Sequence, residues 1–182
     1  MRESFWKLLE PDYFRAMMFC RKLIGDRDAG DDLYQDALIN ALNGFSTLKE
    51  QSSFRPWLYR IIVNTFHSAN RRPWWKRMIP ITSEIENIPA GTNQFDTLTA
   101  KRWLRQLFKV LTKEQQALVT LHELEGWPIS ELAELFGNTE GAIKAKLFRA
   151  RIKMKSALAN IEKKRRQEIR SWTQPINMSL HL

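Results

Sequence analysis

Apolar residues recur at every third or fourth position along most of this chain, with polar residues between them. Because an α-helix repeats every 3.6 residues, this spacing predicts amphipathic helices rather than strands. No segment shows the strict alternation of a half-buried strand, so the expected fold class is all-α. The expected helical stretches are residues 5–24, 31–44, 54–71, 96–111, 112–125, 128–137 and 139–162.

A change of composition in the middle of the chain predicts two small domains. Residues 73–95 contain three prolines and a glycine and keep no sustained period, which indicates an extended linker. Three helices can share one core in residues 1–72, and about four can form a bundle in residues 96–162. Residues 163–182 form a C-terminal tail, which ends either as a frayed terminus or as a segment that docks on a partner.

Single residues mark several expected helix ends. Pro11 should divide the first helical stretch, and Gly25 should end it. Gly44 is a plausible left-handed cap for the second stretch. Thr112 and Gln115 have the spacing of a capping box at the start of a helix.

Side-chain periodicity also gives an expected core. It predicts one inward face on each of the three helices of the first domain, and inward faces before and after Thr112 in the second. The expected inward set is Phe5, Leu8, Leu9, Tyr13, Ala16, Met17, Cys20, Leu23, Ile24, Leu33, Ala37, Leu38, Ala41, Phe54, Trp57, Leu58, Ile61, Ile62, Thr65, Phe66, Ala69, Leu98, Trp103 or Leu104, Leu107, Val110, Leu111, Ala117, Leu118, Leu121 and Leu124.

Residues 126–155 carry the spacing of a helix-turn-helix. Ala133 lies where two helices must approach closely, and Gly137 follows at the turn, where positive φ is needed. Ile143 is the apolar anchor of the second helix, and Thr139 can cap it. Pro128 suits the start of the first helix.

The second helix of this motif has two distinct faces when its residues are placed about 100° apart. Its inward residues are Ile143, Leu147, Ala150, Met154 and Leu158. Its outward residues are Ala145, Phe148, Arg149 and Ile152, flanked by Lys144, Lys146, Arg151 and Lys153. An arginine, an aromatic and a small residue between basic edges are typical of a helix that reads the major groove. A solvated basic face is the alternative, but it would leave Phe148 and Ile152 uncovered.

Composition favours a polyanionic partner without naming it. The 29 Lys and Arg residues outnumber the 20 Asp and Glu residues, for a formal net charge of +9. DNA, RNA and an anionic membrane surface would all fit that charge. The N-terminus lacks a signal-peptide core and no apolar run is long enough to cross a bilayer, so we expect a cytoplasmic protein without membrane insertion. One cysteine, Cys20, and three scattered histidines, His67, His122 and His181, indicate no metal site or cofactor.

Three stretches in this order resemble one family. GDRDAGDDLYQDALINAL and SFRPWLYRIIVNTFHSANRR are similar to region two of the bacterial extracytoplasmic-function (ECF) sigma factors, the two-domain specificity subunits of RNA polymerase. The stretch from Leu111 to Leu158 resembles region four, including its Gly-Thr-Val-Lys-Ser-Arg-Leu-x-Arg-Ala-Arg signature. The resemblance implies that the protein binds core polymerase and directs promoter recognition and transcription initiation, and that it is not an enzyme.

The resemblance also implies roles for named residues. Region two of the family binds the clamp coiled coil of the largest polymerase subunit, and by position this contact falls to Asp31, Asp32, Gln35, Asp36 and Asn40. The same region melts and reads the −10 element, which falls to Lys49, Ser52, Ser53, Phe54, Asn64, His67 and Arg71. Region four reads the −35 element as duplex, which falls to Thr139, Lys144, Ala145, Lys146, Phe148, Arg149 and Arg151, and it also meets the polymerase flap. An anti-sigma factor or another recruiting protein is a further implied partner.

The sequence departs from the family pattern at two places. Gly30 and Asp31 stand where Ala-Glu is usual, and Ala145 and Lys146 replace the usual Ser-Arg. Lysine meets phosphates as a point charge and discriminates bases poorly, so we expect a weak or unusual −35 preference that depends on Arg149.

Two other functions compete with this interpretation. A stand-alone helix-turn-helix regulator would need an apolar dimer seam and an effector domain. A nucleic-acid enzyme would need a convergent carboxylate cluster, for which Asp31, Asp32 and Asp36 are the candidates. Trp74 and Trp75, close to four basic residues, could stack on nucleic acid or pack onto the first domain.

Overall fold

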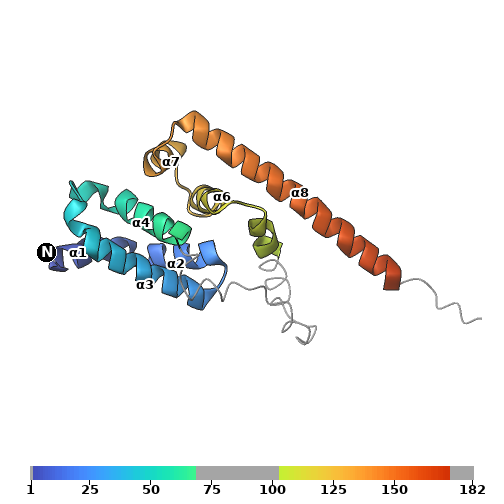
Figure 1. Cartoon of the computed structure of the whole chain (residues 1–182), viewed down its shortest axis with the longest axis horizontal. Coiled ribbons are helices and arrows are strands. Elements are labelled where there is room, and N and C mark those ends of the chain that lie inside the picture. Colours follow the sequence, from blue (N-terminus) through green and yellow to red (C-terminus); the bar gives the residue numbers. More distant parts are fainter. Residues whose placement is uncertain (1, 69–102, 173–182) are drawn as a thin grey trace, which may run out of the picture.

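The computed structural model describes residues 2–68 and 103–172, and every regular element in those two ranges is helical (Figure 1). This confirms the predicted all-α class. The predicted linker 73–95, the residues Arg71, Trp74 and Trp75, and positions 173–182 of the predicted tail lie outside the described residues.

Four α-helices and three short 3₁₀ turns form the first domain. They are α1 (Arg2–Leu9), η1 (Glu10–Asp12), α2 (Tyr13–Ile24), α3 (Arg27–Gly44), η2 (Phe45–Thr47), η3 (Gln51–Ser53) and α4 (Phe54–Ser68). Helices α2, α3 and α4 pack side by side, and α1 lies across one end of them. The predicted inward faces meet in this core, where Phe5, Leu33, Leu58, Ile62 and Phe66 are buried together with Phe19, which was not predicted. Tyr13 was wrongly placed in the core, since it is 46% exposed.

Most of the predicted helix ends are confirmed in this domain. Pro11 lies in the 3₁₀ turn that separates α1 from α2, and Gly25 ends α2 with a φ of 74°. Asp26 then caps α3 by accepting a hydrogen bond from the backbone N–H of Ala29 at 2.9 Å. The left-handed cap at Gly44 was wrong, because Gly44 has a φ of −91° and the chain continues into a 3₁₀ turn.

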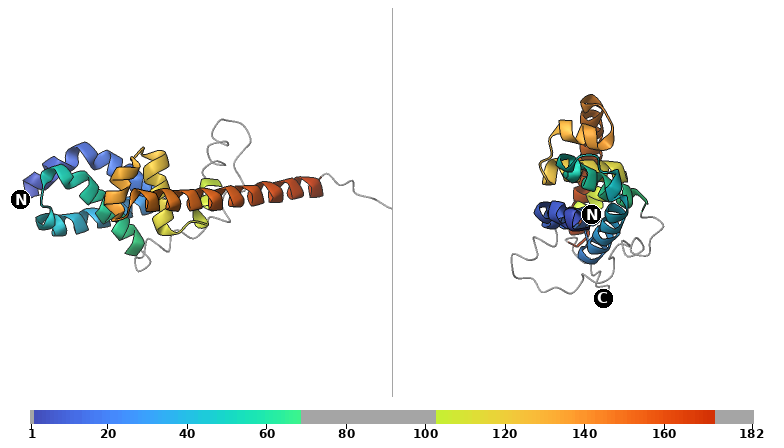
Figure 2. Two further views of the ribbon diagram at one scale, coloured as in Figure 1. Left: turned by 90° about the horizontal axis from the view of Figure 1, so that it is seen from above. Right: turned by 90° about the vertical axis from the view of Figure 1, so that its left-hand side faces the viewer.

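The second domain is built around a very long last helix. Its elements are a helix over residues 103–109, α6 (Lys113–Val119), the π-helical segment η6 (Thr120–Leu124), α7 (Ile129–Phe136) and α8 (Glu140–Trp172). The first half of α8 packs on α6 and α7, and its second half extends beyond the rest of the molecule (Figure 2). The helix therefore runs to Trp172, ten positions past the boundary expected at 162.

Local signals in the second domain are mostly confirmed. Thr112 and Gln115 form the capping box, with side chain and backbone bonded in both directions. Val110 and Leu124 were wrongly placed in the core, since they are 41% and 45% exposed; next to Val110 the buried residues are Phe108 and the predicted Leu111. The π-helical segment accounts for Leu124, because widening the helix at Thr120 rotates the residues after it away from the predicted face.

The two domains pack directly against each other. Helix α4 contacts both α6 and α7, α2 contacts η6, and the buried apolar residues of both domains form one continuous cluster. We call this contact the domain seam: α2 and α4 on one side, residues 105–137 on the other. Tyr59 and Val63 are buried there, although the predicted inward stripe of α4 did not contain them.

Candidate nucleic-acid and polymerase interfaces

The helix-turn-helix has the turn geometry that its sequence predicts. Gly137 takes a φ of 62° at the end of α7, and Ala133 is buried where the two helices meet. The Thr139 hydroxyl accepts a hydrogen bond from the backbone N–H of Ala142 at 3.2 Å, which caps the start of α8. Pro128 lies one residue earlier than expected, at the N-cap of α7. These contacts fix the direction in which α8 leaves the turn.

The outward face of α8 carries uncovered apolar side chains. Ile143, Leu147 and Ala150 are buried on the inner side, as predicted, whereas Phe148 is 61% exposed and Ile152 is 49% exposed. Arg149 lies beside Phe148 and is exposed; it makes no ion pair with any residue of the described ranges. An unpaired guanidinium beside an exposed aromatic ring matches the donors and the apolar contact that a major-groove reading helix needs.

The basic edges of this face are held by acidic and polar neighbours. Lys146 donates from Nζ to Glu114 Oε1 at 2.6 Å and to Asn138 Oδ1 at 3.2 Å. Lys144 Nζ lies 3.5 Å from Glu140 Oε2, and both side chains are more than half exposed. Because surface pairs of this kind contribute only about 0–1 kcal/mol, they can exchange for phosphate contacts at small cost.

Two further outer cations have intramolecular partners. Arg151 donates from two guanidinium nitrogens to Glu123 Oε1, and Lys153 donates to Gln115 Oε1 at 3.1 Å. The sequence did not indicate these pairings, because their acceptors lie far away in the chain. Of the candidate cations on α8 from 144 to 153, Arg149 is therefore the one without a described intramolecular partner.

The predicted polymerase-binding residues lie along α3. Asp31 receives a bidentate pair from Arg21 of α2, with Nε 2.6 Å from Oδ1 and the terminal nitrogen 2.9 Å from Oδ2. This hydrogen bond to Arg21 lowers the pKa of Asp31. Asn40 donates to Thr65 Oγ1 of α4 at 3.0 Å. These two residues therefore bind their own domain.

An exposed isoleucine lies within the same α3 surface and was missed in the sequence. Ile39 is 56% exposed and follows Gln35 by four positions and Asp36 by three. Residues at those spacings share one side of a helix. Ile39 falls outside the predicted inner stripe of its helix, so helical period alone could have predicted that it is exposed.

The predicted −10 residues separate into two groups. Lys49, Ser52 and Ser53 are exposed on the connection that contains η2 and η3. Asn64 and His67 are exposed near the other end of α4, about 16 Å and about 21 Å from Ser53 at a rise of about 1.5 Å per residue. They do not surround one pocket, but they could follow one strand along the helix.

Phe54 does not take the predicted place among them. It is 3% exposed, and its ring packs edge-on at 5.6 Å from that of Phe5, measured between centroids. Phe45 and Trp57 lie beside it in the same aromatic cluster. Phe54 therefore stabilises the first core and cannot form the wall of a base pocket in this conformation.

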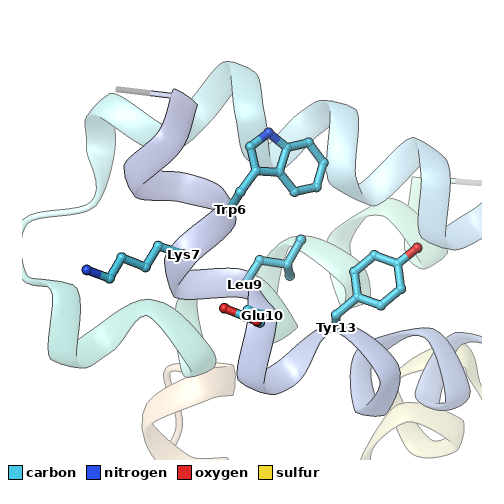
Figure 3. A pocket seen from close by; sticks show the side chains of 5 residues that line it. All are labelled: Trp6, Lys7, Leu9, Glu10 and Tyr13. Atoms are coloured by element: carbon cyan, nitrogen blue, oxygen red, sulfur yellow. The ribbon is translucent and has the colours of Figure 1, made fainter.

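A hollow of about 480 Å³ lies on the outside of α1, η1 and the start of α2 (Figure 3). Trp6 and Tyr13 stand out from the ribbon with Leu9 between them, and Lys7 points away from the rings. Glu10 completes the lining. None of the predicted site residues lines this hollow.

Two other kinds of site, a metal-binding cluster and a membrane-spanning helix, are absent from the part of the chain that the structure describes. It contains no cluster of three His, Cys, Asp or Glu residues placed to hold a metal ion. Cys20 is buried, and burial raises the pKa of its thiol. Within residues 2–68 and 103–172, no helix combines the length and the apolar character needed to cross a bilayer.

Two family models match the two domains separately. Residues 14–76 match "Sigma-70 region 2", and residues 101–154 match "Sigma-70, region 4". The second match contains the helix-turn-helix described above, and the first contains α2, α3 and α4.

Curated relatives match both domains together. The chain is 30% identical over 153 residues to the ECF RNA polymerase sigma factor SigM of Mycobacterium tuberculosis, covering 84% of this chain and 76% of SigM. It belongs to the ECF sigma factor family. RNA polymerase sigma factor YlaC of Bacillus subtilis is 29% identical over 172 residues, covering 92% of this sigma factor and 97% of YlaC.

Solved structures share the fold of this sigma factor. The sigma factor RpoE of Bartonella quintana, solved in complex with the anti-sigma factor NepR, aligns with a TM-score of 0.61 at 24% identity, over 86% of this chain and 98% of that one. CnrH, solved with the cytosolic domain of CnrY, aligns with a TM-score of 0.62 at 17% identity, over 88% and 90% of the two chains.

Proposed function

We propose that this ECF sigma factor binds core RNA polymerase through α3 and recognises the −35 promoter element through the outward face of α8. The observation that carries the second assignment is the exposure of Phe148 beside an Arg149 without a described partner. A guanidinium in that position can donate to O6 and N7 of guanine, and the ring can contact a thymine methyl. The flanking cations at 144, 146 and 151 would meet phosphates after leaving their acidic partners.

The polymerase contact falls to the exposed part of α3. Gln35 and Ile39 offer a polar and an apolar group on one side of the helix, with the carboxylates of Asp32 and Asp36 beside them. This mixed surface fits a helical partner such as the clamp coiled coil, because an apolar centre with a polar rim is typical of protein interfaces. The second domain would meet the flap of the polymerase.

The first domain would also hold the melted −10 strand. Lys49, Ser52 and Ser53 at one end of α4, and Asn64 and His67 at the other, are polar groups that could bind backbone and unstacked bases along its length. Arg71, outside the described residues, is proposed for the same contact from the family resemblance alone. We assign no catalytic step to these residues. The protein would act as an initiation factor rather than as an enzyme, in the cytoplasm, where the polymerase is.

A regulatory partner completes the proposal. The solved relatives RpoE and CnrH were each captured with a partner, an anti-sigma factor in the first case. We infer that an anti-sigma factor, or another recruiting protein, controls this chain as well.

Transcription from a pool of promoter fragments tests the proposed function. Core polymerase is mixed with the fragments with and without the purified protein, and the transcript starts are sequenced. The proposal predicts new starts that share a −10 and a −35 element and that disappear without the protein. Unchanged starts in both reactions would reject it.

A further inference from the structure

The hollow outside α1, η1 and the start of α2 has no part in the functions described so far. None of the residues assigned to polymerase or promoter lines it. It lies on α1 at one end of the molecule, whereas the last turns of α8 extend from the other end (Figures 1 and 2). Its volume of about 480 Å³ falls within the range of roughly 300–1,000 Å³ that ligand sites occupy. A partner held there would leave both assigned surfaces free.

Two aromatic rings of the lining are half-exposed but held in place. Trp6 and Tyr13 are 47% and 46% exposed. The Trp6 ring packs edge-on against the buried ring of Phe5, with 5.4 Å between centroids. The Tyr13 ring packs in the same way on the buried ring of Tyr34, at 5.5 Å. Because these contacts fix the orientation of both rings, a ligand that lies against them orders few side chains on binding.

A free carboxylate stands beside the two rings. Glu10 is exposed, lines the hollow, and its carboxylate makes no hydrogen bond or ion pair with any side chain that the structure describes. Lys7 belongs to the same lining but points away from the rings (Figure 3). The electron-rich face of an aromatic ring and a carboxylate both attract positive charge. The hollow therefore has the composition of a cation site.

The sign of the local charge supports a basic partner. Residues 3–14 contain three carboxylates, from Glu3, Glu10 and Asp12, and one cation, from Lys7, in a chain whose formal net charge is +9. A surface that binds DNA or an anionic bilayer would carry the opposite sign. This end of the molecule is thus electrostatically distinct from the basic face of α8.

An arginine fits this site better than a lysine does. Its planar guanidinium can stack on an aromatic face while its N–H groups donate to one carboxylate in a bidentate pair. Phe14, next to Tyr13, is 65% exposed, so apolar surface continues beyond the hollow. A small free cation would leave that surface uncovered, whereas the neighbours of an arginine in a protein chain can cover it. We propose that the hollow binds an arginine side chain of a partner protein, with the guanidinium against both rings and paired with Glu10.

Nitrogen-15 NMR of the full chain tests this site, with the indole N–H of Trp6 as the reporter. The chain has seven tryptophans, so the Trp6 peak is identified by its loss in Trp6→Phe. The probe is the tripeptide leucyl-arginyl-leucine, acetylated and amidated at its ends. Its neutral counterpart carries citrulline in place of arginine, which keeps the shape and removes the charge. We expect the arginine peptide to shift the peak saturably, and the citrulline peptide to bind about tenfold more weakly, because the cation–π and ion-pair contributions are both lost.

Three variants assign the contacts. Glu10→Gln removes the charge of the site and should weaken the arginine peptide about fivefold, the scale of an exposed ion pair. Tyr13→Leu keeps an apolar residue but removes a ring, and it should weaken the peptide about threefold. Glu3→Gln is the matched control, because it makes the same charge change at an exposed position of α1 outside the lining, and it should leave the affinity unchanged.

Several results would overturn the arginine site. They are a Trp6 peak that the arginine peptide does not move, equal affinity for the citrulline peptide, and equal affinity in Glu10→Gln and Glu3→Gln. Tetramethylammonium that binds as tightly as the peptide would indicate a site for small organic cations instead. A single-stranded oligonucleotide that shifts the peak at lower concentration would indicate a nucleic-acid surface, and a shift that follows protein concentration alone would indicate contact between copies. Since no polymerase or promoter enters these measurements, their failure leaves the proposed function standing.

Discussion

Gly30 of α3 lies directly against the backbone of Arg21 in α2: a Cβ atom on Gly30 would stand 2.5 Å from the Arg21 Cα. The glycine stands where the family pattern that this stretch resembles has alanine. Its missing side chain allows α2 and α3 to approach closely, and that approach supports the bidentate pair between Arg21 and Asp31. The departure from the family pattern is thus a packing feature of the first domain.

Replacing Gly30 should therefore destabilise the protein. We expect Gly30→Ala to lower the free energy of unfolding by about 1–3 kcal/mol, the usual cost of overpacking, despite the better helix propensity of alanine. Gly141→Ala is the matched control, because a Cβ there meets only Thr139 Oγ1 at 4.0 Å, and it should raise stability by about 0.5–1 kcal/mol. Urea unfolding measures both; equal effects of the two substitutions would contradict the close approach.

Removing the unpaired guanidinium should weaken base discrimination at −35. Arg149→Ala should cost about 1–3 kcal/mol of affinity for the preferred duplex and relax the preference at one base pair. Lys144→Ala, which removes a flanking phosphate contact, should weaken all sequences alike and reduce the salt slope by about one. Fluorescence anisotropy over a set of duplexes and salt concentrations distinguishes them. Strong sequence preference that persists without Arg149 would refute the assignment.

Charge reversal on α3 should act on polymerase and not on DNA. We expect Asp36→Lys to weaken binding to core polymerase by tenfold or more, on the scale of about 1.4 kcal/mol per decade, because the new cation repels basic groups of the partner. Arg149→Ala should keep polymerase affinity and misplace the transcript starts. The assignment of the two surfaces fails if both variants lose polymerase binding equally.

Acid should destabilise the folded chain through His67. His67 is exposed as a residue, but partial burial of its ring beside α6 lowers the pKa of this histidine below 6.5, with Glu114 opposing and Lys113 adding to the shift. A group with a depressed folded pKa binds its proton more readily in the unfolded chain, so stability falls as the pH drops below about 6.5. His67→Gln should flatten this pH dependence in thermal unfolding. An unchanged slope would contradict the prediction.

Local sequence signals predicted much of this molecule. Gly25 and Gly137 end helices as expected, Gly137 with the predicted positive φ, and the capping box at Thr112 formed, because turns and caps depend on neighbours in the chain. The exposure of Phe148 followed from helical period alone. The residue roles assigned to the interfaces stay predictions.

The sequence was least informative where contacts between distant parts of the chain determine burial and ion pairing. Helical period placed Phe54 on the buried face, which is confirmed by its contact with Phe5, whereas the role beside a base pocket came from the family resemblance alone and was wrong. Tyr59 is buried because α4 has two covered sides, one in each domain. The ion-pair partners of Lys146 and Arg151 could not be predicted either, because Glu114 lies in α6 and Glu123 in η6, far from α8 in the sequence.

Binding of the purified full chain to core RNA polymerase in the absence of DNA is the most direct test of this account. A labelled chain titrated with core polymerase should saturate at one protein per polymerase, and Asp36→Lys should shift the curve to higher concentration. A chain that binds promoter duplexes but shows no saturable binding to polymerase would contradict the account.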